Sequence, residues 1–447
     1  MMIGFYIFAG ILLSVLYIVM MSMMIIFERD KPKNIIIWSF VFVLTQIVGY
    51  IVYILIRQVF YKKRNSLVTK EKEDSIYDNL ISNKVRDNAI ACDYDVFNFN
   101  SLAYNSNVTV NNNYEIITER DTFKNSLIND LTNAKKFIIF ELTKVNNADF
   151  EDVKNILIEK AKANVDVRFV YDRFNNVKLL KELKNAGVRV YRFSKHNTVG
   201  KVYANLRNVI NIDGDTIYFS NFDISNKQLK SQNETTCAYL KVKGDITQNI
   251  DIAVHKDTIF ASGKYIQYDE KQKPSYSNNC TMQYIVNSAS NDMELSLIKA
   301  ICMAKKSVQL ELSQFIPTES IMSLLKFAIN SNIEVRLMVP LKNYSFGKYF
   351  ASRAYAKELA LLGANVYLFD GYINFNAITI DDEYVIYGSY IVDREHINTS
   401  PQNILFIKDN KAVKAFNEMF NKSIENSYRI NNAKYMLLRE KFFKNFV

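Results

Sequence analysis

Two long apolar runs open the chain, and shorter apolar segments alternate with amphipathic ones in the rest. Residues 1–27 and 35–56 carry no charged side chain. Each run is long enough to cross a bilayer as a helix. The polar segment ERDKPKN between them is too short for more than a tight loop. The pattern predicts a transmembrane helical hairpin within residues 1–64, with both of its ends on one side of the membrane.

A cleaved signal peptide is the alternative interpretation of the first run. The run lacks a basic start and a small-residue cleavage site, and its apolar stretch is too long for a signal. The positively charged residues that follow the second run favour a cytoplasmic C-terminal region: Arg57, Lys62, Lys63 and Arg64. We therefore expect a multi-pass protein of the plasma membrane whose soluble region lies in the cytoplasm, beside anionic lipid.

An internal repeat follows a polar linker that we predict at residues 65–99. The first copy contains AKKFIIFEL (134–142) and NVDVRFVYD (164–172), and the second contains AKKSVQLEL (304–312) and NIEVRLMVP (332–340). Strands that alternate with amphipathic helices are typical of α/β layers with a mixed sheet covered by helices. We predict two domains, residues 100–270 and 271–447, with a site between them. A duplicated fold without a shared site is the alternative.

Each copy ends in a predicted β-hairpin. The first reads NLRNVINIDGDTIYFS (205–220) and the second reads NFNAITIDDEYVIYGS (374–389). Asp-Gly and Asp-Asp pairs favour tight turns, so Asp213 and Asp381 are predicted turn residues.

The net charge, the cysteines and the small number of histidines limit the functions that the chain could have. The net charge of +10 suits an anionic partner, either nucleic acid or acidic lipid. The cysteines show no CxxC pair and no metal-ligand spacing, which indicates reduced structural thiols: Cys92, Cys237, Cys280 and Cys302. Only three histidines are present, at positions 196, 255 and 396.

The order of these features resembles the bacterial cardiolipin synthases. Two apolar runs joined by a charged loop, with Trp38 early in the second run, are similar to the membrane hairpin of that family. The duplicated body resembles the phospholipase D superfamily in the motifs VYDRFNN (170–176), IDGDTIYFSNFDI, QFIPTESIMSLLKFAI and GSYIVDRE. The resemblance covers residues 1 to about 430. It implies two phospholipase D-like α/β/α repeats packed together behind a two-helix transmembrane hairpin.

The resemblance also implies a chemistry that needs one signature per repeat. The signature reads His, any residue, Lys, four residues and Asp, with an Asn about ten residues after the Asp. One His forms a phosphohistidine and the other protonates the leaving alkoxide, while Lys and Asn hold the phosphoryl oxygens. The Asp is expected to orient the imidazole. In the family, one phosphatidylglycerol gives its phosphatidyl group to another, with no metal or organic cofactor.

Both signatures are degenerate in this chain. The two Asp positions are retained as Asp213 and Asp381. The His, Lys and Asn positions hold Leu206, Asn208 and Asp223 in the first copy, and Asn374, Asn376 and Ile391 in the second. The small pair that follows the hairpin survives as Gly388-Ser389 only in the second copy, since the first has Ser220-Asn221.

The substitutions predict the loss of the family reaction. Leucine has no proton to transfer, and an Asn amide is not a nucleophile for phosphorus. Loss of a nucleophile that acts in such a constellation costs roughly 10⁴ to 10⁶ in rate. As stand-ins, His196 would need a loop rearrangement, His255 is far from either signature and His396 lies past the second hairpin. Asp213 and Asp381 could in principle attack phosphorus, but the turn role is preferred.

Three functional hypotheses follow. The preferred one is a membrane-anchored pseudoenzyme that binds phospholipid or regulates an active cardiolipin synthase, as a partner or a homo-oligomer. The first alternative is an active phosphatidyltransferase with non-standard residues. The second is a nucleic-acid-binding relative, which the membrane hairpin and the scattered aromatic residues oppose. The tail NNAKYMLLREKFFKNFV is predicted to pack on the second copy as a helix, or to lie at a lipid interface.

Overall fold

The computed structural model describes the greater part of the chain. The described residues are 2–27, 35–45, 48–54, 95–143, 147–172, 177–193, 205–219, 234–264, 280–286, 293–341, 346–389, 392–393, 401–430, 440 and 444. The chain divides into an N-terminal unit within residues 1–72 and a body that contains both repeats.

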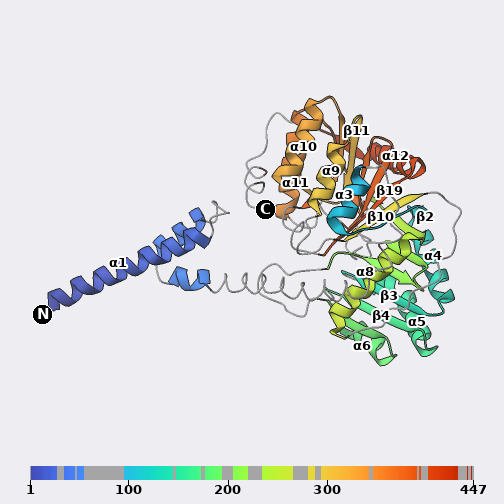
Figure 1. Cartoon of the computed structure of the whole chain (residues 1–447), viewed down its shortest axis with the longest axis horizontal. Helices are drawn as coiled ribbons and strands as arrows, with labels where there is room; N and C mark the ends of the chain where they lie inside the picture. The colour runs from blue at the N-terminus through green and yellow to red at the C-terminus, as the bar shows by residue number, and fades with distance from the viewer. Residues whose placement is uncertain are drawn as a thin grey trace. The chain divides into compact units, whose positions relative to one another are not determined.

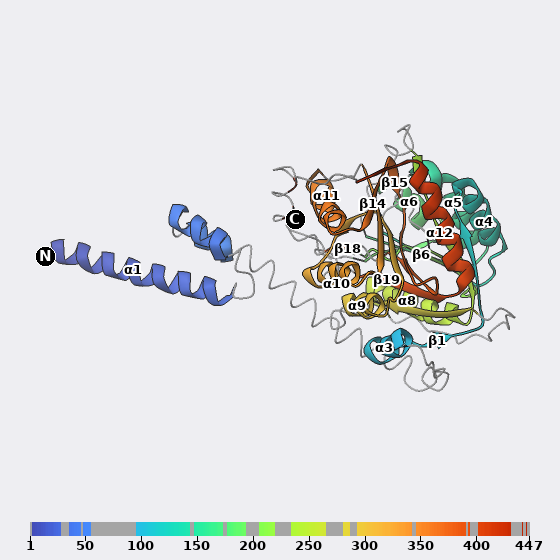
Figure 2. The ribbon, with the colours of Figure 1, turned by 90° about the horizontal axis from the view of Figure 1, so that it is seen from above.

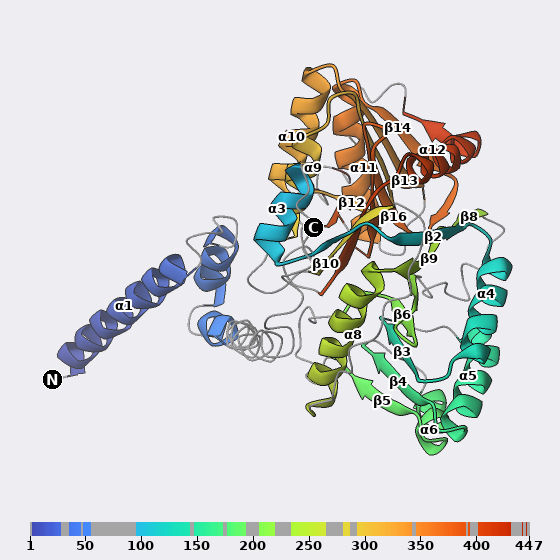
Figure 3. The same ribbon diagram turned by 45° about the vertical axis from the view of Figure 1, so that its right-hand side comes forward.

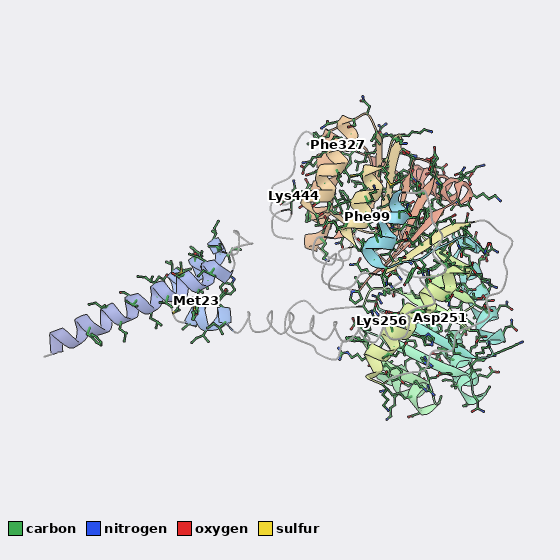
Figure 4. All side chains as sticks on the ribbon, viewed as in Figure 1. Met23, Phe99, Asp251, Lys256, Phe327 and Lys444 are labelled. Carbon is green, nitrogen blue, oxygen red and sulfur yellow. The ribbon has the colours of Figure 1, made fainter. Side chains whose placement is uncertain are left out.

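The N-terminal unit is helical. Helix α1 (Met2–Phe27) is followed by helical residues 35–45 and 48–54. Met24, Phe42 and Tyr53 are buried where these segments pack, and the Tyr50 hydroxyl lies 3.6 Å from the Met23 sulfur. Figure 4 labels Met23 on α1. Within the described residues, no helix combines the length and apolar character that a membrane span requires. The transmembrane hairpin therefore stays a prediction.

The first repeat is a seven-stranded mixed sheet in the order β2-β9-β7-β6-β3-β4-β5. Strands β3, β4 and β5 are parallel, and the other neighbours are antiparallel. The strands are β2 (Asn112–Ile117), β3 (Phe137–Leu142), β4 (Asp166–Tyr171), β5 (Arg189–Arg192), β6 (Val209–Ile212), β7 (Thr216–Phe219) and β9 (Tyr239–Gly244). Figure 3 shows α4 (Arg120–Asn133), α5 (Asn147–Lys162) and α6 (Val177–Asn185) on one side of β3 to β5, with α8 (Ile246–Ser262) on the other.

The second repeat is a nine-stranded mixed sheet in the order β1-β10-β19-β17-β16-β11-β13-β14-β20. The strands are β1 (Val108–Thr109), β10 (Thr281–Val286), β11 (Ser307–Leu312), β13 (Glu334–Pro340), β14 (Asn365–Phe369), β16 (Asn376–Ile380), β17 (Tyr384–Gly388), β19 (Asn403–Lys408) and β20 (Ser427–Arg429). Figure 2 shows α9 (Glu294–Cys302), α10 (Glu319–Asn330) and α11 (Phe346–Leu361) on one side of this sheet, with α12 (Asn410–Glu425) on the other. The predicted α/β layers with mixed sheets are confirmed.

A shared apolar core joins the two repeats. It collects buried side chains from both sheets, from α8 and from α12. Phe219 of the first repeat contacts the rings of Tyr284 and Tyr387 of the second, at centroid distances of 5.9 and 6.3 Å. The Tyr387 hydroxyl donates to the Ala238 carbonyl at 2.6 Å. The repeat interface therefore contains a packed apolar core, next to which any site between the repeats would lie.

The segment before the first sheet belongs structurally to the second. Helix α3 (Asp95–Tyr104) packs on α9 and β10 (Figure 1), and β1 pairs with β10. Gln283 of β10 donates to the Phe97 carbonyl at 3.1 Å, which ties α3 to this sheet. The domain boundaries at residues 100 and 271 remain a prediction. The contacts of α3 and β1 show that residues 95–109 pack with the second repeat.

Candidate functional site at the repeat interface

The retained aspartate of the first signature holds a tight turn. Asp213 and Gly214 both have positive φ, 55° and 69°, in a three-residue loop between the paired Ile212 and Thr216. The Asp213 carboxylate accepts hydrogen bonds from three successive backbone amides, those of Lys135, Lys136 and Phe137, at 2.7–2.9 Å. The carboxylate thus fastens the hairpin β6–β7 to the start of β3.

Asp381 does the same in the second repeat. It accepts from the amides of Lys305, Lys306 and Ser307 at 2.5–2.8 Å. Asp381 and Asp382 have φ of 53° and 57°. The repeated AKKF and AKKS motifs are therefore the amide donors for the two retained aspartates.

This geometry corrects the role that the family signature implied for the aspartates. Asp213 binds the first residue of β3, whereas Asn208 binds Thr143, one residue past the end of that strand. Six residues of extended chain span about 20 Å. Asp213 therefore cannot orient a group at position 206, because it lies a full strand length away. It stabilises the turn instead.

The two Asn residues at the lysine positions close the ends of the central strands. The Asn208 side-chain oxygen accepts from the Thr143 amide at 2.9 Å. The Asn376 side-chain oxygen accepts from the amide and the hydroxyl of Ser313, both at 2.9 Å. The side chains that replace the phosphate-binding ammonium groups are thus hydrogen-bonded within their own repeats.

Both signature segments reach across the repeat interface. The amide of Leu206 donates to the Pro401 carbonyl of the second repeat at 2.9 Å, and the amide of Asn374 donates to the Thr236 carbonyl of the first at 3.0 Å. Short strands reinforce the second contact, since β15 (Gly371–Ile373) pairs in parallel with β8 (Glu234–Thr236). The positions that carry the two histidines in the family therefore lie at this interface.

A buried charged cluster sits beside Leu206. Arg207 forms an ion pair with Asp257 of α8, and its guanidinium also donates to the Gln402 carbonyl at 3.3 Å. The Asn205 side chain donates to Glu141, which is 1% exposed. Burial and the neighbouring Asp257 raise the pKa of Glu141 well above its usual value, against the opposing effect of Arg207. Burial beside Asp257 therefore disfavours the charged form of Glu141.

The second repeat has an acid at the same position but an apolar residue in place of Arg207. Glu311 occupies the position of Glu141 on β11 and is 2% exposed. Phe375 stands where the first repeat has Arg207, and its ring packs 6.2 Å from that of Phe416 on α12. Burial raises the pKa of Glu311 to about 8, and a hydrogen bond from the Ser423 hydroxyl opposes the shift. The two repeats have thus diverged at the same position.

Asn374 contacts a cysteine. Its side chain forms a hydrogen bond with Cys237, and the Cys237 thiol forms a second hydrogen bond with Tyr239. Burial raises the pKa of the Cys237 thiol, so the thiolate that a nucleophile requires is disfavoured. The retained pair Gly388-Ser389 has a packing role: the Asn403 side chain accepts from the Ser389 amide at 3.1 Å, and the Ser389 hydroxyl accepts from the Asn403 amide at 3.1 Å.

The remaining sequence-predicted residues fall into two groups. Asp223, Ile391, His196, His396 and Cys92 lie outside the described residues. His255 is buried on α8, where its ring nitrogen lies 3.0 Å from the carbonyl and the carboxylate of Asp251. Figure 4 labels Asp251 on this helix. Among the described residues, no group of His, Cys, Asp and Glu is arranged to hold a metal ion.

Sequence reasoning missed the Glu141–Arg207–Asp257 cluster. The sequence carried a signal for its acid alone, because FIIFEL and SVQLEL place a Glu at the same position of a repeated strand that is otherwise largely apolar. A buried acid in a strand needs a partner or a proton.

Comparison with known proteins relates the chain to the cardiolipin synthase family. A family model described as "Cardiolipin synthase, PLD-like domain" matches residues 297–424. The chain is 24% identical to a probable cardiolipin synthase of Bacillus subtilis, over 95% of this chain and 89% of that protein. It is 26% identical to the major cardiolipin synthase of the same organism, over 96% and 95% of the two chains.

A solved structure shows the same fold. The crystal structure of phosphatidylserine synthase from Haemophilus influenzae superposes with a TM-score of 0.56 at 13% identity. The match covers 74% of this chain and 92% of that chain. The two packed α/β repeats therefore have a solved counterpart in that enzyme.

Proposed function

We propose that this chain, which belongs to the cardiolipin synthase family of the phospholipase D superfamily, is a membrane-anchored pseudoenzyme that acts on phospholipid synthesis through a partner. The observation that carries the proposal is the state of the four reactive positions. They hold Leu206, Asn208, Asn374 and Asn376, and the oxygens of both lysine-position Asn side chains accept hydrogen bonds from strand-end residues. A phosphoryl group at the repeat interface would meet neither a nucleophile nor a cation from these positions.

The family reaction needs an imidazole to attack phosphorus and a second to protonate the leaving alkoxide. Leu206 offers neither group, and the amide of Asn374 neither attacks nor protonates at neutral pH. Charge that develops on the phosphoryl oxygens would lack the two ammonium groups that stabilise it. The raised pKa of Cys237 also argues against a thiolate in their place.

Membrane anchoring is supported by the N-terminal unit. Residues 1–27 and 35–56 carry no charge, and α1 exposes large apolar side chains such as Phe8, Ile11 and Ile26, each more than half exposed. An apolar surface of this kind is stable when lipid covers it. The anchor would hold the basic body at an anionic cytoplasmic leaflet.

A retained fold with an altered site favours binding over turnover. The two signature segments still meet at the repeat interface, through Leu206–Pro401 and Asn374–Thr236. The body can thus present the surfaces of a synthase without competing for its reaction. We propose that it binds a phospholipid headgroup weakly or pairs with an active synthase and regulates it.

Expression in cells that lack cardiolipin synthase tests the proposal. We expect no cardiolipin, although the protein is folded and present in the membrane fraction. Affinity capture of the full chain from native membranes should bring down an enzyme of phospholipid synthesis. Cardiolipin that rises with expression of the chain would contradict the proposal.

An active synthase with unconventional residues is the second candidate. Identities of 24–26% that extend over nearly the whole of known synthases favour it. The same expression experiment decides between the two candidates, because only the active one makes cardiolipin.

A further inference from the structure

The ends of α10 and α11 form an exposed apolar surface away from the repeat interface. Phe327 is 67% exposed, Leu361 57% and Leu362 41%. The two helix ends are neighbours, since a Cβ built on Gly363 would lie 3.8 Å from the Ile329 side chain. We call Phe327, Leu361 and Leu362 the α10–α11 patch. Figure 3 shows the two helices side by side.

Lysines flank the patch. Lys326 precedes Phe327 and pairs with Glu358 of α11 at 2.6 Å. Glu358 lies three and four residues before Leu361 and Leu362, which places it on their side of the helix. Lys444 of the C-terminal segment pairs with the same Glu358 and lies 5.1 Å from the Tyr355 ring. Figure 4 labels Phe327 and Lys444 on the second repeat.

The flanking charges are not balanced. A second carboxylate, Glu440, is bound by Lys357 at 2.7 Å and by Arg353 at 3.6 Å. In these described ion pairs, four basic side chains meet two carboxylates, an excess of two positive charges.

We propose that the α10–α11 patch docks the body onto an anionic lipid surface. Lysines are depleted in the cores of protein interfaces, whereas at a bilayer their stems cover apolar surface and their charges reach the headgroups. Each basic residue adds attraction to an anionic leaflet. The inference rests on the proposed membrane anchoring and adds a second contact through the body.

Tryptophan fluorescence of the full chain tests the proposal. The chain has one tryptophan, Trp38, so Phe327→Trp in a Trp38→Phe background gives a single reporter. The protein is reconstituted in vesicles of phosphatidylcholine with phosphatidylglycerol, some of it brominated on the acyl chains. We expect quenching of the Trp at position 327. Leu102→Trp in the same background is the matched control, because Leu102 is 89% exposed on α3, a helix without basic residues.

Charge variants test the role of the lysines. Lys326→Gln with Lys444→Gln should reduce the quenching, since each lost lysine weakens attraction to an anionic surface about fivefold. Lys414→Gln is the control, because Lys414 is an exposed lysine on α12. Replacement of phosphatidylglycerol by phosphatidylcholine should have the same effect as removal of the two lysines.

The outcomes separate this inference from the proposed anchor. If the protein floats with vesicles but position 327 is not quenched, the docking proposal is wrong and the anchor stands. If the protein does not float, the anchor itself is wrong. A blue shift at position 327 that depends on protein concentration and not on brominated lipid would assign the patch to a second copy of the chain and overturn the lipid proposal.

Discussion

Glu141 and Glu311 occupy the same position in the two repeats, but Arg207 acts on Glu141 whereas the second repeat has Phe375 at the position of Arg207. Arg207 lowers the pKa of Glu141 against the effects of burial and Asp257. Phe375 has no charge to offer, and burial raises the pKa of Glu311 to about 8. Burial therefore favours the protonated form of both acids, although only Glu141 has Arg207 to oppose the shift.

Replacement of Glu311 by Gln should remove a pH dependence of stability. The folded protein holds a proton on Glu311 up to pH about 8, whereas an unfolded carboxyl releases it near 4.5. The free energy of unfolding of the wild type should therefore fall as pH rises from about 4.5 to about 8. Glu311→Gln lacks this titration. The difference in free energy of unfolding, variant minus wild type, should therefore increase over this pH range, by about 5 kcal/mol at most.

Denaturation of the full chain at pH 5, 7 and 9 measures the effect. Glu418→Gln is a control, because Glu418 is an exposed acid on α12 and its removal should shift all three values alike. If the difference in free energy of unfolding between Glu311→Gln and the wild type does not grow with pH, Glu311 is ionised in the folded protein.

Removal of Arg207 should destabilise the body strongly. Arg207→Ala leaves Asp257 buried without its ion-pair partner, and loss of one member of a buried pair costs about 3–5 kcal/mol. Arg189→Ala is the control: its side chain is 55% exposed beside Asp166, and an exposed pair contributes about 1 kcal/mol or less. If urea denaturation shows that Arg207→Ala and Arg189→Ala lose the same free energy of unfolding, the ion pair of Arg207 with Asp257 is not desolvated.

The sequence predicted the elements with local signals and missed those that depend on long-range contacts. The two β-hairpins follow from Asp213-Gly214 and Asp381-Asp382, whose positive φ angles need only neighbouring residues. The α/β layers follow from the repeat. The place of α3 and β1 on the second sheet was not predictable, because their partner β10 begins at Thr281, far along the chain.

The same distinction holds for the candidate site: the positions of its residues were predictable, but their long-range contacts were not. The spacing of the signature located Leu206, Asn208, Asn374 and Asn376, and the structure brings both segments to the repeat interface. The role of the aspartates was not predictable from spacing, since Asp213 finds its amide donors 76 to 78 residues earlier in the chain. The ion pair of Arg207 with Asp257 joins residues 50 apart and has no local signal.

Asp213→Asn should weaken the first hairpin without creating backbone strain. Asn tolerates positive φ, but its amide group cannot accept from the Lys135 amide, which now binds one of the two carboxylate oxygens. The loss of one charge-assisted hydrogen bond predicts a decrease of about 1.5–3 kcal/mol in the free energy of unfolding. Asp215→Asn, at an exposed position of the same turn, should have little effect.

Gly388→Ala should be among the most disruptive small substitutions in the second repeat. A Cβ at position 388 would lie 2.3 Å from the Asn403 carbonyl oxygen, which is backbone and cannot move aside as a side chain can. Strands β17 and β19 would have to separate where Gly388 pairs with Ile404, next to the reciprocal Ser389–Asn403 hydrogen bonds. Overpacking of this kind costs about 1–3 kcal/mol or more. Ser389→Ala, which removes one hydrogen bond and adds no clash, should cost about 1 kcal/mol. If thermal denaturation shows Gly388→Ala to be as mild as Ser389→Ala, the close approach of the two strands is wrong.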